Sequence, residues 1–350
     1  MRHLLAFLSC AVFLAFGCSR HKNANFLASL PPAATVLTPV DSLDLEQFGV
    51  LSTGYLVKYG RWVAIHELWT EYNLTVLNLD TRSAKKTIAV GRGPGEMLYG
   101  SNFYLEGTGV TLTDSYSLMT VSLDMASLDE DHIPPLDTLG VFKSVDNAFS
   151  RLRKVKGGYV SPVPYYNTFD ENAWYSLWDV DGYVGNVIAR PKVEGVERTD
   201  RVSTHAFFCS VLMTVHPDKE RLCVGHVAMD ALSFAIVEDR KLKEVKRLEY
   251  GMPKLGVAGN GDIVIGIDRN TFIGITSDKD YVYLLYSGQN RKGPADEANH
   301  LIVYDWDGNF VTRYDLSQHV TDIFIDGNEL WCLSAEPSCK LLVYRLPEIS

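Results

Sequence analysis

The sequence predicts an all-β protein, built as a six-bladed β-propeller with four-stranded antiparallel blades. Short segments rich in Val, Ile, Tyr, Trp and Thr follow one another from residue 34 to the C-terminal end, as strands require. Gly, Asn, Asp and Pro separate them, as turns require. No amphipathic run keeps a helical period for more than about a dozen residues. Groups of several strands recur every 40 to 50 residues or so, a period typical of propeller blades.

The blades are expected in chain order, and one strand is left over at the start. Residues 34–43 precede the first unit and are rich in strand-forming residues. We expect this segment to be the outer strand that completes the last blade and closes the ring, because closure leaves no long exposed sheet edge. The six predicted units are 51–90, 98–142, 147–200, 203–250, 260–316 and 320–348.

Tight turns punctuate the predicted strands. Asp-Gly and Gly-Asn steps, as in Trp306-Asp307-Gly308-Asn309, favour positive φ and predict hairpins. Asp305, Asp307 and Asn309 also alternate as in a calcium loop, but no Glu stands at the twelfth position that such a loop needs. Hairpin turns explain the string, so the sequence predicts neither a metal site nor a cofactor.

The first seventeen residues predict a signal peptide. A short basic start precedes the apolar segment Leu4–Phe16, which is too short to span a membrane. Leu14-Ala15-Phe16-Gly17-Cys18 resembles the lipobox of bacterial lipoproteins, in which the cysteine is acylated and becomes the first mature residue. The alternative is an ordinary signal with a chance cysteine at Cys18. The predicted division is residues 1–17 as signal peptide, 18–33 as anchor linker and 34–350 as propeller.

The charge of the chain limits its partners. The formal net charge is −10, with Lys and Arg scattered along the sequence. Such a chain lacks the basic stripe that nucleic acid needs, and it does not favour adhesion to an anionic lipid surface. Contact with the lipid bilayer is therefore expected through acylated Cys18.

Four cysteines remain after Cys18, and two interpretations of them stay open. Each of two pairs flanks a predicted turn, so each pair could be a disulfide across two antiparallel strands of an exported protein. The alternative is four free buried thiols, because free Cys packs as a small hydrophobe and cross-strand disulfide geometry is demanding. The two candidate pairs are Cys209 with Cys223 and Cys332 with Cys339.

Three strings together resemble a known family. Gly91-Arg92-Gly93-Pro94-Gly95-Glu96, Tyr286-Ser287-Gly288 and Val303–Asn309 look like the TolB-like six-bladed β-propeller lipoproteins of Bacteroidetes. The resemblance covers essentially the whole mature chain. It implies a six-bladed propeller and a lipid-anchored envelope protein on the outer membrane. It implies no reaction, because a fold does not settle function. Ser19-Arg20-His21-Lys22 is basic, unlike the acidic start of many surface-exposed relatives, which favours a periplasm-facing anchor.

The glycine-rich string 91–96 has two interpretations. Its backbone N–H groups and Arg92 could form an anion-binding loop. No predicted helix follows it, so it is neither a dinucleotide fingerprint nor a phosphate loop. The alternative is a connection between blades, in which glycines supply positive φ and Arg92 pairs with Glu96.

An aromatic cluster in the third unit also has two interpretations. Tyr and Trp bind sugars and peptides through flat apolar faces with a polar handle, so exposed members would mark an interaction surface. The alternative is a bulky and irregular blade core. The cluster holds Tyr159, Tyr165, Tyr166, Phe169, Trp174, Tyr175, Trp178 and Tyr183.

These features favour a non-enzymatic binding module, lipid-anchored in the envelope, that presents one face of its ring to an envelope protein or a glycan. The alternative is a hydrolase or lyase acting on glycan, with acid and base from blade loops at the mouth of the channel. A scaffold within an envelope complex is a third possibility. No catalytic residue is assigned from the sequence. The candidate ligand-binding residues are Arg92, Glu96, Tyr165, Tyr166, Trp174 and Trp178.

Overall fold

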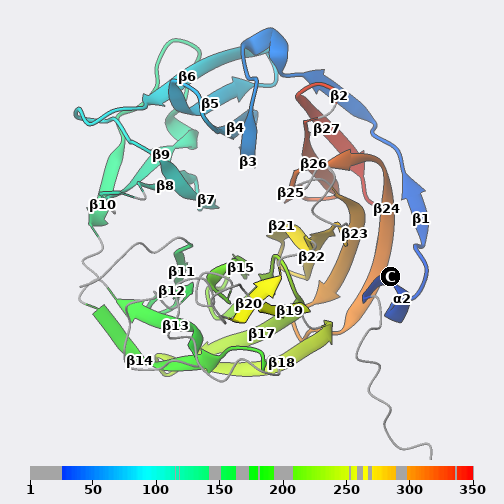
Figure 1. The fold of residues 1–350 in the computed structure, drawn as a ribbon. Helices are drawn as coiled ribbons and strands as arrows, with labels where there is room; N and C mark the ends of the chain where they lie inside the picture. Colours follow the sequence, from blue (N-terminus) through cyan, green and yellow to red (C-terminus); the bar gives the residue numbers. More distant parts are fainter. Residues whose placement is uncertain are drawn as a thin grey trace, which may run out of the picture.

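The chain folds into a ring of β-sheets around a central axis (Figure 1). Six sheets of four or five strands stand as blades, so the predicted all-β propeller with four-stranded antiparallel blades is confirmed. The computed structural model describes residues 26–114, 116–117, 119–141, 151–162, 173–179, 182–192, 208–251, 254–257, 263–266, 270–288, 298–335 and 337–349.

Each blade begins with its innermost strand. The first blade holds β3 (Thr53–Tyr59), β4 (Trp62–Glu67), β5 (Tyr72–Asn78) and β6 (Ser83–Ala89). The second holds β7 (Gly100–Glu106), β8 (Gly109–Asp114), β9 (Met119–Asp124) and β10 (Asp137–Val141). The third holds β11 (Arg153–Val155), β12 (Gly158–Pro162), β13 (Ala173–Asp179) and β14 (Gly182–Ala189). The fourth holds β15 (Val211–Val215), β16 (Arg221–His226), β17 (Asp230–Glu238) and β18 (Lys241–Gly251). The fifth holds β21 (Phe272–Ser277), β22 (Tyr281–Tyr286), β23 (Ala298–Asp305) and β24 (Phe310–Val320).

The sixth blade is completed by the N-terminal segment, as predicted. Its sheet runs β2 (Asp41–Asp44), β27 (Lys340–Arg345), β26 (Glu329–Ser334) and β25 (Asp322–Asp326), and β2 is antiparallel to β27. The segment expected to be one strand is in fact two. β1 (Thr35–Leu37) pairs in parallel with β24 and becomes a fifth strand of the neighbouring blade. The N-terminal segment therefore binds the last two blades together.

The predicted linker ends earlier than residue 33. Helix α2 (Phe26–Ser29) lies against the ring, and Phe26 is fully buried among Tyr250, Phe272 and Tyr286, with ring centroids 4.8, 5.4 and 4.9 Å away. An aromatic side chain buried in this way ties its segment to the core. Residues 1–25, which include Cys18 and the predicted signal peptide, lie outside the described residues.

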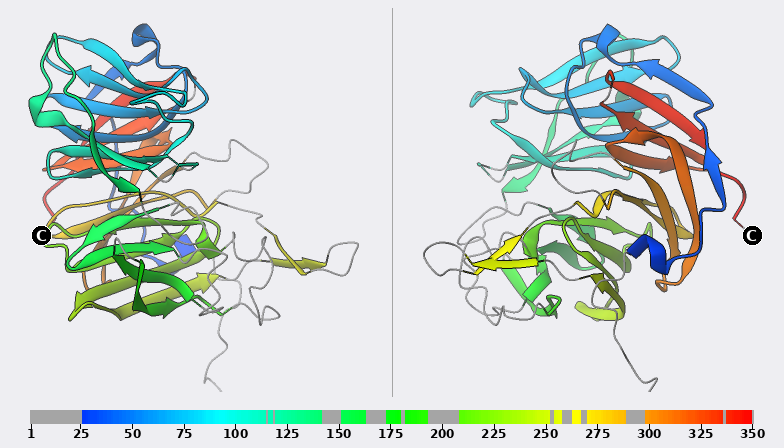
Figure 2. Two further views of the ribbon diagram at one scale, coloured as in Figure 1. Left: turned by 90° about the vertical axis from the view of Figure 1, so that its left-hand side faces the viewer. Right: turned by 45° about the vertical axis from the view of Figure 1, so that its right-hand side comes forward.

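The fifth blade starts later than predicted. Residues 254–257 (β19) and 263–266 (β20) form a separate two-stranded sheet, which projects from one face of the ring (Figure 2). The predicted strand at Ile263 therefore belongs to a hairpin outside the blade, and the blade begins at Phe272. The short apolar run at 263–266 has the composition of a blade strand, which is why the sequence misassigned it.

Side chains between neighbouring sheets form the core. One large cluster joins the third and fourth blades around Trp174, Tyr175 and Phe208, and another joins the fourth and fifth around Phe234, Phe272 and Tyr286. Alternate residues of each strand point to opposite sides of a sheet, so every blade contributes to the packing on both of its sides.

The four described cysteines are free thiols, which answers the open question about disulfides. Cys332 packs with the fifth and sixth blades, whereas Cys339 packs on the other side of the sixth sheet with the first blade. Their side chains therefore point apart. Cys223 is buried on β16 opposite Thr214, and Cys209 precedes β15. The interpretation as free thiols is the one that the structure supports.

The two faces of the ring differ in their connections. At one face, which we call the hairpin face, strands are joined by tight turns such as 60–61, 107–108, 156–157, 239–240 and 327–328, with 125–136 as the long exception. The opposite face, which we call the long-connection face, lies where each innermost strand begins. Its described connections include 68–71 between β4 and β5, 90–99 between the first and second blades, and 227–229 between β16 and β17.

Candidate functional site

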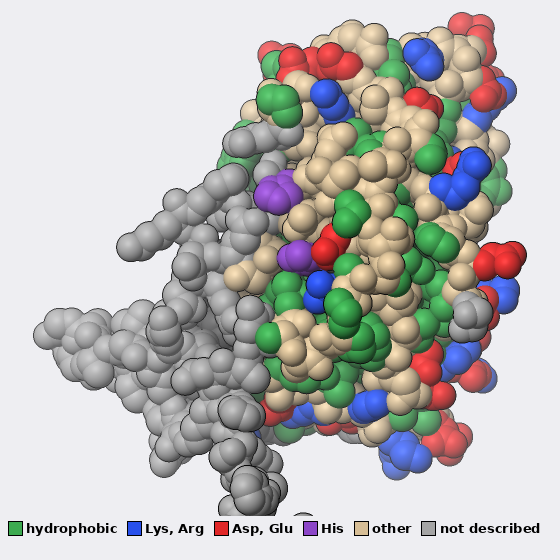
Figure 3. Space-filling model, turned by 90° about the vertical axis from the view of Figure 1, so that its right-hand side faces the viewer, with side chains coloured by type: hydrophobic (Ala, Val, Ile, Leu, Met, Phe, Trp, Pro, Cys, Tyr) green, Lys and Arg blue, Asp and Glu red, His purple; other side chains and the backbone are tan. Residues whose placement is uncertain are grey.

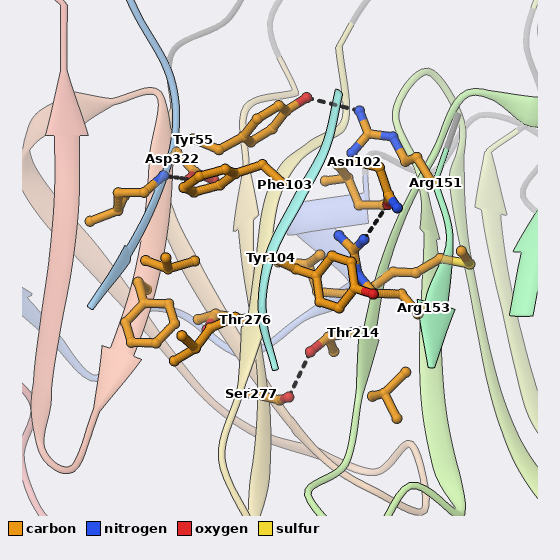
Figure 4. Close-up of a pocket in the computed structure, with 18 of the residues that line it drawn as sticks. Tyr55, Asn102, Phe103, Tyr104, Arg151, Arg153, Thr214, Thr276, Ser277 and Asp322 are labelled. Carbon is orange, nitrogen blue, oxygen red and sulfur yellow. Dashed lines mark hydrogen bonds between the residues drawn. The ribbon is translucent and has the colours of Figure 1, made fainter. Parts of the chain in front are cut away.

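The innermost strands enclose a central channel with a cavity of about 660 Å³. Pockets of this size are typical of sites for small ligands. Residues from β3, β7, β15, β21 and β25, together with the segment around β11, line it. This lining brings arginine, lysine, aspartate, asparagine and hydroxyl side chains together, so we take the channel as the candidate site (Figure 4).

Arg153 lies deep in this channel at the start of β11. Its Nη1 donates to Asn102 Oδ1 at 2.5 Å and to the Leu152 carbonyl at 3.0 Å, and its Nε donates to the Met213 carbonyl at 3.2 Å. The guanidinium also lies over the ring of Tyr104, with 4.4 Å from Cζ to the centroid. Burial lowers the pKa of this guanidinium to about 10, so Arg153 keeps its charge at neutral pH.

Asn102 holds Arg153 in place. It lies at a bulge of β7 with φ of 52°, which is uncommon outside glycine, although Asn tolerates it better than most residues. Its Oδ1 accepts from the backbone N–H of Leu152 at 2.8 Å as well as from Arg153, and its Nδ2 donates to Thr113 Oγ1 at 3.2 Å. Backbone strain of this kind clusters at functional sites.

Arg151 enters the channel two residues before Arg153. Its Nη2 donates to Tyr55 Oη at 3.0 Å, and its guanidinium lies 5.6 Å from the centre of that ring (Figure 4). Asp322, at the start of β25, faces the same space and accepts from the Leu56 backbone N–H at 2.8 Å. Burial raises the pKa of the Asp322 carboxyl to about 7, because desolvation outweighs this hydrogen bond and the charges of Arg151 and Arg153.

The described lining is rich in positive charge. Arg151, Arg153, Lys154 and Lys219 are its cationic side chains, and Asp322 is its one carboxyl group. Lys154 and Lys219 both approach Glu106, at 3.2 and 3.8 Å. No ion pair between described residues involves either arginine. The channel therefore holds two guanidinium groups against one carboxyl group whose pKa is near 7.

Flat rings stand beside these charges. His66 stacks between Tyr55 and Phe103, with ring centroids 5.9 and 5.8 Å apart and interplanar angles of 13° and 24°. Burial lowers the pKa of His66 to about 4, so its imidazole is neutral at pH 7. Hydroxyl groups of Thr214 and Ser277, 2.6 Å apart, line another part of the wall.

The loop 91–96 connects the first blade to the second, as one interpretation predicted. Glu96 Oε2 accepts from the backbone N–H of Gly93 at 2.6 Å, and Gly95 has φ of 79°. A Cβ on Gly91 would stand 1.9 Å from the same carboxylate, so the loop closes around its own Glu96. Arg92 is exposed, and no ion pair between described residues joins it to Glu96. Ligand binding by Arg92 and Glu96 stays a prediction.

The aromatic cluster of the third blade is mainly core. Trp174 is 1 % exposed and donates from Nε1 to the Phe208 carbonyl at 3.0 Å. Trp178 is also buried and packs with Leu152 and Tyr159. This corrects the expectation of exposed stacking faces at Trp174 and Trp178, because the blade sides bury both indoles. Tyr165 and Tyr166 lie outside the described residues.

Exposed aromatic side chains occur instead on the long-connection face. Trp69, between β4 and β5, is 86 % exposed with φ of 60°, and its ring centroid lies 5.7 Å from that of Tyr99, which lines the channel. Tyr116, between β8 and β9, is 75 % exposed. Leu51 and Val90 are exposed near the strand ends of the same face. Sequence reasoning missed Trp69 and Tyr116, because single aromatics in turns have no periodic signal.

Comparison with known proteins now assigns the family. The family model of TolB-like six-bladed propellers matches residues 63–328. The chain belongs to this family. No curated protein matches the sequence.

Several solved structures align with most of this chain. A Bacteroides fragilis protein described as exported aligns with a TM-score of 0.51 at 11 % identity, covering 94 % of this chain and 98 % of that one. A chain of the mitotic checkpoint complex aligns with a TM-score of 0.47 at 12 % identity, covering 91 % and 95 %. The Cps50 propeller domain of Myceliophteria thermophila aligns with a TM-score of 0.39 at 9 % identity, covering 84 % and 97 %. At these identities the likeness to the Bacteroides protein shows the fold alone.

Among the described residues, no group of three or more His, Cys, Asp or Glu side chains could hold a metal ion. No helix in the described part of the chain is long and apolar enough to cross a membrane.

Proposed function

We propose that this protein is a non-enzymatic binding module of the cell envelope, anchored to the outer membrane by acylated Cys18 and facing the periplasm. Its long-connection face and the channel below would bind a glycan or an envelope protein. The observation that carries the proposal is the placement of exposed Trp69 and Tyr116 on the face where the channel strands begin. Exposed aromatics gathered at a cavity are typical of binding surfaces.

The composition of the channel favours binding over hydrolysis. Glycosidases use a pair of carboxyl groups flanking the scissile bond. The described lining offers Asp322 alone, beside a histidine that is neutral at pH 7. The glycan-acting hydrolase or lyase therefore remains the second candidate, and Asp322, with its raised pKa, is the residue that it would need as a proton donor.

The test is a thermal-shift screen of the full-length protein in detergent against glycans, muropeptides and short peptides. A ligand at 100 times its Kd adds about 2.7 kcal/mol to the free energy of unfolding, which raises Tm. The variant Trp69→Ala should lose the shift. The matched control is Val245→Ala, an exposed apolar residue on outer strand β18.

Two results would contradict the proposal. The first is a ligand-induced shift that both variants keep, which would move binding away from the long-connection face. The second is turnover of the stabilising glycan by the wild-type protein, with loss of turnover in Asp322→Asn, which would make the protein an enzyme.

A further inference from the structure

The two arginines of the channel would attract a negatively charged ligand. A guanidinium group presents five N–H donors and does not lose its charge at physiological pH. Arg151 donates to Tyr55 Oη among the described residues, which leaves donors facing the channel. Arg153 is held by Asn102 and two backbone carbonyls, all neutral acceptors. Its charge is therefore solvated by hydrogen bonds but not neutralised.

The geometry places both charges on one side of the channel wall. Arg151 lies in the bend before β11 and Arg153 begins that strand, and the side chains of both line the same cavity. They are close enough for the charge of Arg151 to lower the pKa of Arg153. Two like charges held together in a partly desolvated cavity repel each other, and an anion between them removes that repulsion.

Asp322 does not neutralise the two arginines. It is the one carboxyl group of the described lining, and its Oδ2 is engaged by the Leu56 backbone N–H. Its carboxyl is also protonated in a sizeable fraction of molecules at neutral pH. By contrast, the two lysines of the lining already share Glu106. The unbalanced charge is therefore specific to the arginine pair.

We propose that the channel binds an acidic glycan, with the carboxylate of a uronic acid residue held between Arg151 and Arg153. This deepens the proposed binding function and rests on it. A carboxylate matches the fork of a guanidinium, and bidentate pairs of this kind are strong and specific. The hydroxyl groups of the sugar would bond to polar groups of the same lining, such as the hydroxyls of Thr214 and Ser277.

An acidic peptide shares the carboxylate, so it is the alternative ligand that the experiment compares. The glycan is favoured by an exposed indole, because the apolar side of a pyranose ring packs flat on such a surface. Trp69 is 86 % exposed, and its ring lies 5.7 Å from that of Tyr99, a residue of the channel lining. A neighbouring sugar of the same chain would pack on this indole.

The experiment is calorimetric titration of the full-length protein in detergent with three probes of similar length. These are tri-galacturonate, the neutral galactose trisaccharide and tri-glutamate. We expect tri-galacturonate to bind at least about tenfold more tightly than either other probe. Arg151→Gln should weaken tri-galacturonate binding about tenfold or more. The matched control Lys156→Gln, whose exposed lysine pairs with Glu220 outside the channel lining, should change it less than about twofold.

Arg153→Lys serves as a second variant, because it keeps the buried charge if loss of Arg153 prevents folding. It should weaken binding, because Nε and Nη1 of Arg153 hold Met213, Leu152 and Asn102 while Nη2 is left for the ligand, and an ammonium group cannot serve all of these acceptors at once. Equal binding of the neutral trisaccharide, tighter binding of tri-glutamate, unchanged binding by Arg151→Gln, or failure of tri-galacturonate to bind would each overturn the inference. The proposed binding function is then still tested separately by Trp69→Ala. Cleavage of tri-galacturonate would instead overturn that function and leave carboxylate recognition standing.

Discussion

The hairpin face and the long-connection face lie at opposite ends of the same strands, but different interactions shape them. At the hairpin face, each turn is fixed by local chemistry. Asp305 accepts from the backbone N–H groups of Asp307 and Asn309 at 3.0 and 2.7 Å, and Lys246 from the neighbouring blade donates to Asn309 at 2.8 Å. Charged side chains gather along this edge of the rim (Figure 3). The hairpin interpretation of this string is thereby confirmed.

The long-connection face shows the opposite arrangement. It exposes Trp69 in a strained backbone conformation and Tyr116 in a turn, and it opens onto buried charges in the channel. Binding residues are often carried by loops on a rigid scaffold. The contrast teaches that local hydrogen bonds within and between blades fix the turn at Asp305, whereas the other face exposes aromatic side chains, which fits the proposed binding function. Changes on the first should cost stability, and changes on the second should affect binding.

The largest expected effect tests the buried charge of the channel. Asp322 has a folded pKa of about 7 against an ordinary value of 3.8, so the folded protein binds more protons than the unfolded chain between these values. Stability should therefore fall as pH rises from about 4 to 7. Asp322→Asn keeps an oxygen for the Leu56 N–H and removes the charge. Its free energy of unfolding at pH 8 should exceed that of the wild type by up to about 4 kcal/mol.

Urea unfolding at pH 4 and pH 8 measures this effect. The charges of Arg151 and Arg153 lower the pKa of Asp322, and Cys332 lies on the neighbouring strand β26. The variant Asp322→Asn leaves these three side chains in place. Asp326→Asn at the hairpin end of the same strand is the control and should change stability by about 0.5 kcal/mol or less. If Asp322→Asn and Asp326→Asn changed the free energy of unfolding equally, the effect could not be assigned to burial of the carboxyl group in the channel.

The next largest effect belongs to a hairpin glycine. Gly308 has φ of 75°, and a Cβ there would stand 2.7 Å from a ring carbon of Phe234, which is buried. Gly308→Ala should lower the free energy of unfolding by about 2–3 kcal/mol, from the strained φ and the overpacking together. Denaturant unfolding measures it, and ligand binding at the other face should be unchanged.

Gly60 is the matched control for Gly308. It has φ of 56° and nothing within 4 Å of its ideal Cβ position. Gly60→Ala should therefore cost only the backbone strain, about 1 kcal/mol. If both variants lose the same free energy of unfolding, the close approach of residue 308 to Phe234 adds nothing to the cost of the Gly308→Ala change.

A smaller and opposite effect is expected at Trp69. Because its φ of 60° disfavours any side chain with a Cβ, Trp69→Gly should raise the free energy of unfolding by about 1 kcal/mol. The same change should abolish ligand-induced stabilisation. Trp69→Ala separates the two effects, since it removes the indole and keeps the strain. A Gly variant that is both less stable and still able to bind would refute the division of roles between the faces.

The smallest expected effect concerns the cysteines. Cys209, Cys223, Cys332 and Cys339 are free thiols, so neither face is cross-linked. A reducing agent should leave Tm unchanged, and all four thiols should react with a labelling reagent in denaturant. A fall in Tm on reduction would show that disulfides stabilise the ring.

The fold was predictable from the sequence because its signals are local. Turns such as Asp307-Gly308 specify hairpins, and repeated hairpins specify blades. The resemblance to the TolB-like family rested on the same turns, and the family match confirms it. The boundary error at Ile263 arose because a short apolar strand does not reveal which sheet it joins.

The channel site was not predictable because it depends on which strand is innermost. Arg151 lies in a bend and Arg153 begins a three-residue strand, and nothing local shows that they point to the axis of a ring. Asp322 and Asn102 come from distant blades and meet them only through the closed ring. The aromatic residues favoured from composition, Trp174 and Trp178, were drawn into the core by the same closure.

The parallel pairing of β1 with β24 has a mechanical consequence. A tether attached before Phe26 would pull first on the buried Phe26 side chain and on the paired residues Thr35, Val36 and Leu37. The closing strand β2 lies after these contacts along the chain, so the load reaches it last. With the anchor proposed at Cys18, β1 would therefore have to separate from β24 before tension reached β2 and the seam of the ring.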